Sequence, residues 1–169
     1  MSDVALPAVF ILVMLTAAMY DVRTRRIPNR LTVGAMLAGL ALGAFSGWGG
    51  IVASVEGIGL AFVISVPLLL LGGLGGGDAK LLMAAGAFLG PGRFLAALLP
   101  IALAGGALAL WTAFSTGQLA GALQRTGGTL ANLATLGRAG SRREIGQSGG
   151  LTIPYGVAIA LGCIWGWFL

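Results

Sequence analysis

The chain has 169 residues, of which 57% are hydrophobic and only 9% are charged. Because a soluble domain carries about 25% charged residues, this composition excludes a soluble protein and predicts one membrane-embedded domain over residues 1–169. The net charge of +5 does not indicate nucleic-acid binding, since no separate polar basic face presents it, and the basic residues are more informative about membrane topology.

The sequence contains no histidine and one cysteine, Cys163, in an apolar segment. One cysteine forms neither an internal disulfide nor a cysteine-clustered zinc site. Without histidine there is no histidine metal site and no Ser-His or Cys-His catalysis. Carboxylates are therefore the acid–base groups of any enzyme activity, and neither a metal nor another cofactor is expected.

The first apolar segment covers residues 4–20, with Asp3 before it. Four arginines follow it closely: Arg23, Arg25, Arg26 and Arg30. A secretory signal peptide has its positive charge first, so this segment is interpreted as a membrane-spanning helix. The positive-inside rule places its N-terminus outside and the arginines in the cytoplasm.

The second apolar segment runs from about 31 to 47, and Asn29 is a suitable N-cap for a helix that starts near Arg30. Three small residues recur in it at four-residue spacing: Ala35, Gly39 and Gly43. This pattern predicts a face that packs closely against another helix. A short outer turn is expected at 47–50.

The third segment covers about 51–71 and contains Glu56, for which the sequence offers no partner. A glycine-rich stretch follows at residues 72–80, with the sequence GGLGGGDAK. Glycines let the backbone approach another chain closely. A carboxylate at the membrane boundary is costly and commonly functional, so Asp78 is a candidate catalytic residue.

Residues 79–90 are apolar, but Gly90-Pro91-Gly92-Arg93 interrupts the run before a further apolar segment at 94–114. Twelve helical residues span roughly 18 Å, which is short for a hydrocarbon core of about 30 Å. Two crossings are favoured, and a single bent crossing is the alternative. With two crossings here the chain has six in total, and of its basic residues only Arg93 then lies outside. This sorting of charge supports two crossings over residues 79–114.

Residues 115–150 are polar, glycine-rich and basic, and their spaced leucines predict an amphipathic helix on the membrane surface. The last apolar segment covers about 151–168 and ends in aromatic residues typical of the membrane interface. The predicted fold class is therefore all-α: a polytopic membrane helix bundle of about six transmembrane helices with its N-terminus outside.

Asp21 follows the first crossing and Asp78 follows the third. An even number of crossings separates them, so both carboxylates are expected at the cytoplasmic face. Aspartic-protease chemistry needs two carboxylates that share one proton. The helix ends favour an ionised Asp78 and a protonated Asp21, whereas the arginines after Asp21 oppose this, and the proton can also belong to the pair as a whole.

Three sets of residues occur in this order along the chain: Tyr20-Asp21 with Arg25-Arg26-Ile27-Pro28-Asn29, then Gly75-Gly76-Gly77-Asp78-Ala79-Lys80, then Ile153-Pro154-Tyr155-Gly156. Together they resemble the type IV prepilin peptidases, which are membrane aspartic proteases of the GxGD type. The resemblance covers most of the chain and assigns Asp21 and Asp78 as the catalytic aspartates.

The resemblance implies cleavage of a leader peptide from pilin-like precursors at the cytoplasmic face of the bacterial inner membrane. The cut falls after a glycine, just before the pilin's hydrophobic helix. Expected partners are the precursor, the lipid bilayer and pilus-assembly machinery, without nucleic acid. The chain is most similar to the small peptidases of Flp/Tad pilus systems. It lacks the long first cytoplasmic loop with paired cysteines of larger members, so their N-methylation activity is not carried over.

Three further residues are candidates for shaping the site. Gly75 and Gly77 are expected to let substrate backbone lie against the loop. Lys80 is a candidate for holding the site or the pilin, with a topology signal or a snorkelling side chain as the alternative. Asp78 could serve only as an N-cap, and Asp21 only as a weak surface partner of an arginine; in the family pattern the catalytic pair is favoured.

A second function class is a small transporter, channel or pilus-assembly subunit whose acidic residues carry protons or cations. A helix broken near a glycine-rich loop also fits that class. A transport relay is expected to place ionisable groups near the middle of the membrane, whereas both aspartates are expected at one face. Their placement therefore favours the peptidase.

Overall fold

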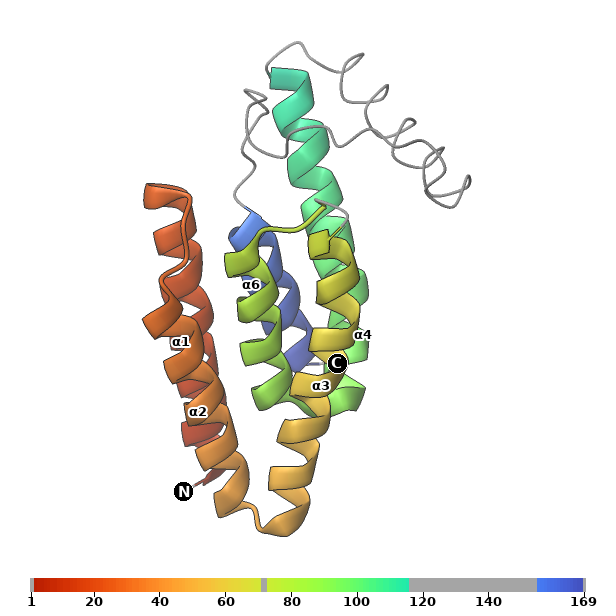
Figure 1. Ribbon diagram of the computed structural model, residues 1–169. Helices are drawn as coiled ribbons and strands as arrows, with labels where there is room; N and C mark the ends of the chain where they lie inside the picture. Colours follow the sequence, from red (N-terminus) through yellow and green to blue (C-terminus); the bar gives the residue numbers. More distant parts are fainter. Residues whose placement is uncertain (1, 71–72, 116–154, 169) are drawn as a thin grey trace. The chain divides into compact units, whose positions relative to one another are not determined.

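A computed structural model describes residues 2–70, 73–115 and 155–168 (Figure 1). The regular elements in these ranges are all helices, which confirms the predicted all-α class for the described part of the chain. They are α1 (Ser2–Thr24), α2 (Asn29–Phe45), α3 (Trp48–Leu70), α4 (Gly76–Ser115) and α6 (Tyr155–Trp167). Beyond residue 115, the surface helix predicted for 115–150 lies outside the described residues.

Contacts between residues divide the chain into two compact units. The first unit joins Met1–Gly105 with Pro154–Leu169, and the second is Gly106–Ile153. The described part of the second unit is the end of α4. The packing and the site that follow belong to the first unit, and the single domain expected from the sequence stays a prediction.

The connection between α1 and α2 is short and has a defined backbone. Pro28, with φ −63° and ψ 134°, is the residue before the first helical residue of α2, and no side chain caps this helix. Asn29 is therefore the first residue of α2 and not its N-cap, so the sequence-based expectation for Asn29 was wrong. The fixed φ of proline already sets the entry into the helix, which leaves the Asn29 side chain available for another contact.

The small-residue face of α2 packs as predicted. Ala35, Gly39 and Gly43 are buried along one side of the helix. A Cβ built on Gly39 would lie 2.8 Å from the Cβ of Ala87 in α4, and one built on Gly43 would lie 2.5 Å from Oγ of Ser54 in α3. Neither glycine has room for a side chain, so these two positions set how closely the three helices approach.

The turn between α2 and α3 is shorter than expected. It consists of Ser46 and Gly47, and Gly47 has a positive φ of 87°. Residues 48–50, which were expected to form the turn, are instead the first residues of α3. The left-handed backbone of one glycine is enough to reverse the chain here.

Gly90 divides α4 into two arms. Its φ of 67° and ψ of 177° interrupt the helix, and essentially only glycine adopts this backbone region. Pro91 follows as the first residue of the second arm, a position that suits proline. The break confirms that the apolar run is interrupted where the sequence predicted it.

The second arm of α4 runs back along α6. Gly162 of α6 lies against Ile101, and Gly166 lies against Ala97, so the two segments run in opposite directions. At the start of α6, the ring of Tyr155 lies over Gly105. As far as Gly105, the second arm therefore returns toward the end of the bundle at which α6 begins.

An aromatic cluster closes the other end of α6. The ring centroid of Phe10 in α1 lies 5.1 Å from that of Trp167 and 5.5 Å from that of Phe88 in the first arm of α4. Phe10 is fully buried. The first arm of α4 thus ends at this aromatic cluster, opposite the end of the bundle at which α6 begins.

Three of the described helices are long and apolar enough to cross a membrane: Leu6–Thr24, Trp48–Leu70 and Gly76–Thr112. Two shorter apolar helices, Asn29–Phe45 and Tyr155–Trp167, accompany them. With α4 folded back at Gly90, the described residues form six helical segments. Six membrane crossings and an outside N-terminus stay predictions.

Candidate active site

Asp21 lies in the last turn of α1, and its side chain is only 7% exposed. A buried carboxylate needs hydrogen-bond donors. One donor is the backbone N–H of Gly156, which lies 2.7 Å from Oδ2 of Asp21. Because Gly156 is in the first turn of α6, the start of the last helix holds the carboxylate at the end of the first one.

Close contact at Gly156 requires a residue without a side chain. A Cβ built there would lie 2.9 Å from Oδ2, 3.1 Å from Cγ and 3.0 Å from Cβ of Asp21. Backbone N–H groups at a helix N-terminus stabilise negative charge. The C-terminus of α1 disfavours a negative charge on Asp21, and the start of α6 opposes this effect. The sequence-based argument about which aspartate carries the proton did not include α6.

Asp78 lies in the first turn of α4, where it is half-buried. Its Oδ2 would lie 2.9 Å from a Cβ built on Gly75. Gly77 lies over the loop that follows α1, and a Cβ built on it would be 3.3 Å from the Cβ of Ile27. Gly75 thus leaves room for the Asp78 carboxylate, and Gly77 lets the first turn of α4 lie close to the α1–α2 connection.

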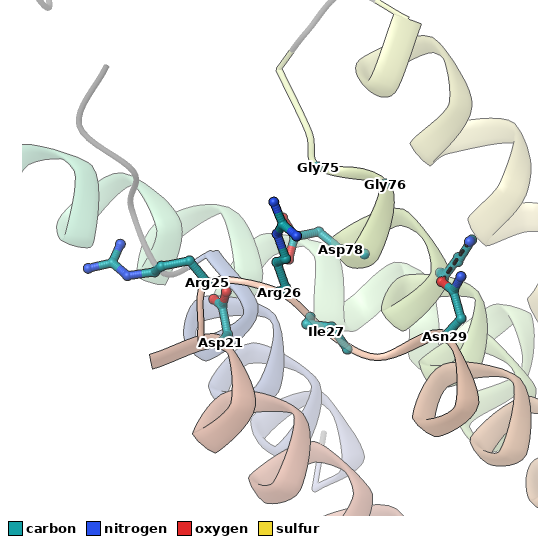
Figure 2. A pocket seen from close by; sticks show the side chains of 10 residues that line it. Asp21, Arg25, Arg26, Ile27, Asn29, Gly75, Gly76 and Asp78 are labelled. Atoms are coloured by element: carbon teal, nitrogen blue, oxygen red, sulfur yellow. Dashed lines mark hydrogen bonds between the residues drawn. The ribbon is translucent and has the colours of Figure 1, made fainter. Parts of the chain in front are cut away.

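Asp21 and Asp78 line the same open pocket, which has a volume of about 450 Å³ (Figure 2). All five residues that the sequence singled out line it, together with five others; the full set is Asp21, Arg25, Arg26, Ile27, Asn29, Gly75, Gly76, Gly77, Asp78 and Lys80. The two carboxylates are close enough for their charges to repel one another. The structure thus brings together the residues of the predicted pair, whose catalytic role stays a prediction.

Three cationic side chains share the pocket with the two carboxylates. Lys80 donates a hydrogen bond from Nζ to Oδ1 of Asn29 at 2.8 Å, which links the first arm of α4 to the start of α2. Arg25 and Arg26 come from the α1–α2 connection, and Figure 2 shows that they extend in different directions from it, with Arg26 on the side of Asp78. Lys80 is therefore a structural link as well as a pocket residue.

The arrangement suits general acid–base chemistry on a substrate in the pocket. One carboxylate can accept a proton from water while the other donates a proton to a carbonyl oxygen. Two carboxylates that repel one another are expected to share one proton. Among the described residues, no three His, Cys, Asp or Glu side chains gather as ligands for a metal ion.

Sequence reasoning missed the contribution of α6 to the site. The motif Ile153-Pro154-Tyr155-Gly156 was recognised as the start of the last helix, but no contact with Asp21 was expected from it. Its first two residues lie outside the described ranges, and Gly156 supplies the N–H. The available signal was a glycine in the first turn of a helix, where a bare N-terminus can bind an anion.

Comparison with known proteins adds a family. A family model described as the type IV leader peptidase family matches residues 8–110. The match covers more than half of the chain and includes both Asp21 and Asp78, but it ends before α6. No curated protein and no solved structure gave a significant match.

Proposed function

Since the chain belongs to the type IV leader peptidase family, we propose that it is an aspartic endopeptidase that removes the leader peptide from Flp-like type IV prepilins. The family is one of membrane peptidases. The observation that carries the proposal is that Asp21 and Asp78, from two separate helices, line one pocket with backbone and glycine contacts at both carboxylates.

The proposed site lies at the cytoplasmic face of the bacterial inner membrane. The arginines that follow α1 support this orientation by the positive-inside rule. A precursor whose apolar helix lies in the bilayer then presents the bond before that helix at the same level as the pocket. Water must reach the scissile bond, and the open pocket between the end of α1 and the start of α4 gives it access.

The proposed mechanism needs no covalent intermediate. The ionised carboxylate of the pair removes a proton from water, and the oxygen of that water attacks the carbonyl carbon of the scissile amide. The protonated carboxylate donates its proton to the carbonyl oxygen. Collapse of the tetrahedral intermediate breaks the C–N bond. The amine leaves with the proton that the first carboxylate took from water, and a hydroxyl of the intermediate gives its proton to the second carboxylate, so the pair again holds one proton.

Cleavage without N-methylation is the proposed activity. Only residues 25–28 separate α1 from α2. This short connection contains no cysteine and has no room for the long cysteine-paired loop of the larger peptidases. A transporter or channel is the second candidate. A transport relay is expected near the middle of the membrane, whereas Asp21 lies in the last turn of α1 and Asp78 in the first turn of α4, which favours the peptidase.

The test is cleavage of a model precursor with a glycine-ended leader by the full chain in membranes. Asp21→Asn and Asp78→Asn keep the size of each side chain and remove its charge. Each is expected to lower the rate by more than about a hundredfold, because a positioned acid or base contributes that much. Glu56→Gln is the matched control, since Glu56 is exposed on α3 and does not line the pocket.

The outcomes separate the two function classes. If both aspartate variants are expressed, folded and inactive while Glu56→Gln retains its activity, the carboxylate pair performs the cleavage. If either aspartate variant cuts at nearly the wild-type rate, the pair is not the catalyst, and the protein must be considered as a transport or assembly subunit.

A further inference from the structure

Arg25 has the unusual backbone among the pocket residues. Its φ is 53°, and it is the one non-glycine residue with a positive φ in the described ranges. The residue follows the end of α1, and its N–H donates to the carbonyl oxygen of Asp21 at 2.9 Å. This is the position at which helices commonly end with glycine, because a side chain makes the left-handed conformation unfavourable.

The left-handed turn at Arg25 positions the residues that follow it in the pocket. Thr24 Oγ1 lies 2.9 Å from the carbonyl oxygens of both Tyr20 and Arg26, which ties the turn to α1. The reversed chain then brings Ile27 against Gly77, one residue before Asp78. A glycine at position 25 would satisfy this geometry without strain, so the backbone gives no reason for an arginine there.

The side chain of Arg25 also lacks a partner in the described part of the protein. It is exposed, it lines the pocket, and its guanidinium makes no hydrogen bond or ion pair with another described residue. A strained residue at a site is a reason to look for a role of its side chain. The guanidinium is free to contact a molecule that enters the pocket.

The charges of the pocket indicate what that molecule carries. Arg25, Arg26 and Lys80 bring three positive charges, whereas Asp21 and Asp78 bring at most two negative charges. If the carboxylates share one proton, the excess of positive charge is larger still. An arginine fork binds a carboxylate through two parallel hydrogen bonds, so an acidic side chain suits this pocket better than a basic one.

We propose that Arg25 is a specificity residue that binds an acidic side chain of the substrate close to the scissile bond. The proposal rests on the proposed peptidase function. Arg25 acts on the choice of substrate and not on the proton transfers, which belong to the two aspartates. The competing occupant of the guanidinium is the phosphate of an anionic lipid at the membrane surface.

The test uses pairs of model precursors in vesicles that contain the full-length protein. Each precursor has a glycine-ended leader, and its segment around the scissile bond is neutral except for one glutamate, whose position is varied from pair to pair. Its twin has glutamine at that position. The enzymes are wild type, Arg25→Gly and the control Arg23→Ala, which removes an exposed arginine of α1 that does not line the pocket.

Arg25→Gly is expected to lower kcat/KM for at least one glutamate precursor by about tenfold, the effect of losing a charge-assisted hydrogen bond. For the glutamine twin, kcat/KM should change less than about twofold, because this precursor has no charged partner for Arg25 to lose. The unfolding temperature should stay the same or rise, because relief of the left-handed strain offsets the greater freedom of glycine in the unfolded chain. Arg23→Ala should leave both twins unaffected.

Three results overturn the proposal. Equal losses for both twins with a lower unfolding temperature make Arg25 a structural residue. Equal losses that occur in vesicles with phosphatidylglycerol and vanish in pure phosphatidylcholine assign it to lipid. Unchanged rates for every precursor leave it without a role in recognition. If the wild type cuts no precursor at all, the peptidase function itself fails, which is a different result from losing discrimination.

Discussion

The two ends of the first unit are held together by different kinds of contact. At the pocket end, a backbone N–H of α6 binds Asp21, and Gly77 lies directly on Ile27. At the other end, Phe10 packs against the rings of Phe88 and Trp167. Backbone and glycine contacts dominate the first end, and large side chains dominate the second.

This difference separates positioning from stability. Aromatic rings at 5.1 and 5.5 Å contribute packing that tolerates small shifts. The guanidinium of Arg93, 5.3 Å from the ring centroid of Trp167, adds a cation–π contact to the same cluster. A catalytic carboxylate, by contrast, has to lie within a fraction of an ångström of its place. Substitutions at the pocket end should therefore change activity, and those at the aromatic end should change stability.

The largest effect on activity outside the two aspartates is expected at Gly156. In Gly156→Ala, the added Cβ would lie about 3 Å from three atoms of the Asp21 side chain, so the carboxylate must move. A displacement of about 1 Å can cost roughly a hundredfold in rate. Precursor cleavage should fall by about that factor while the unfolding temperature changes little.

Gly59→Ala is the matched control for Gly156→Ala. Gly59 lies in α3, and a Cβ there meets no atom within 4 Å. Its alanine variant should cut at the wild-type rate and be slightly more stable, because alanine favours a helix more than glycine does. Wild-type activity in Gly156→Ala would show that the contact of α6 with Asp21 does not position the carboxylate.

Phe10→Ala should have the opposite effect, with lower stability and nearly unchanged cleavage. Phe10 is fully buried and contacts both other rings of the aromatic cluster, so the substitution leaves a cavity. In lipid the cost comes mainly from lost packing, and a loss on the order of 2 kcal/mol in the free energy of unfolding is expected. Cleavage measured well below the unfolding temperature should stay within about threefold of wild type, since the pocket end is intact.

Phe62→Ala provides the comparison for this loss. Phe62 lies in α3 and is 53% exposed, so its removal leaves no internal cavity. Thermal unfolding in the same detergent should show a clear decrease for Phe10→Ala and a small one for Phe62→Ala. A Phe10→Ala protein that unfolds like wild type but has lost its activity would contradict the division between the two ends.

Much of the fold follows from patterns that the sequence carries openly. Apolar segments predict the helices, and the spacing of Ala35, Gly39 and Gly43 predicts the buried face of α2. Gly90 and Pro91 mark the break in α4, because few other residues suit that backbone. The even number of segments between Asp21 and Asp78 predicts that both lie at the same end of the bundle, and in the structure they line one pocket.

Other parts of the site leave no such trace. The N–H that binds Asp21 belongs to the backbone, which every residue except proline carries, so no side chain identifies Gly156 as its donor. Asn29 is equally suited to capping a helix and to accepting a distant hydrogen bond. Only the structure shows that Pro28 precedes the helix and that Asn29 accepts from Lys80. Long-range contacts of this kind depend on packing and not on local pattern.

Gly77→Ala refines the comparison within the pocket end. An added Cβ would lie 3.3 Å from the Cβ of Ile27, so the first turn of α4, which carries Asp78, has to shift by a few tenths of an ångström. A shift smaller than that expected at Gly156 should lower cleavage less, by about tenfold. Gly34→Ala is the control, since a Cβ there meets nothing within 4 Å and Gly34 does not line the pocket. Equal rates for the two variants would remove Ile27 from the positioning of Asp78.

The smallest effect is expected at Lys80, where the pocket end is held by a side chain instead of the backbone. Lys80→Met retains the apolar stem and removes the donor to Asn29. Because this hydrogen bond is exposed, its loss should lower the free energy of unfolding by about 0.5–1 kcal/mol. The rate of cleavage should fall only a few-fold. Lys80→Arg retains a donor and should recover most of the difference. If Lys80→Met instead abolishes cleavage while Lys80→Arg restores it, the cation acts on the substrate directly, and the pocket end depends on side-chain charge as much as on its backbone contacts.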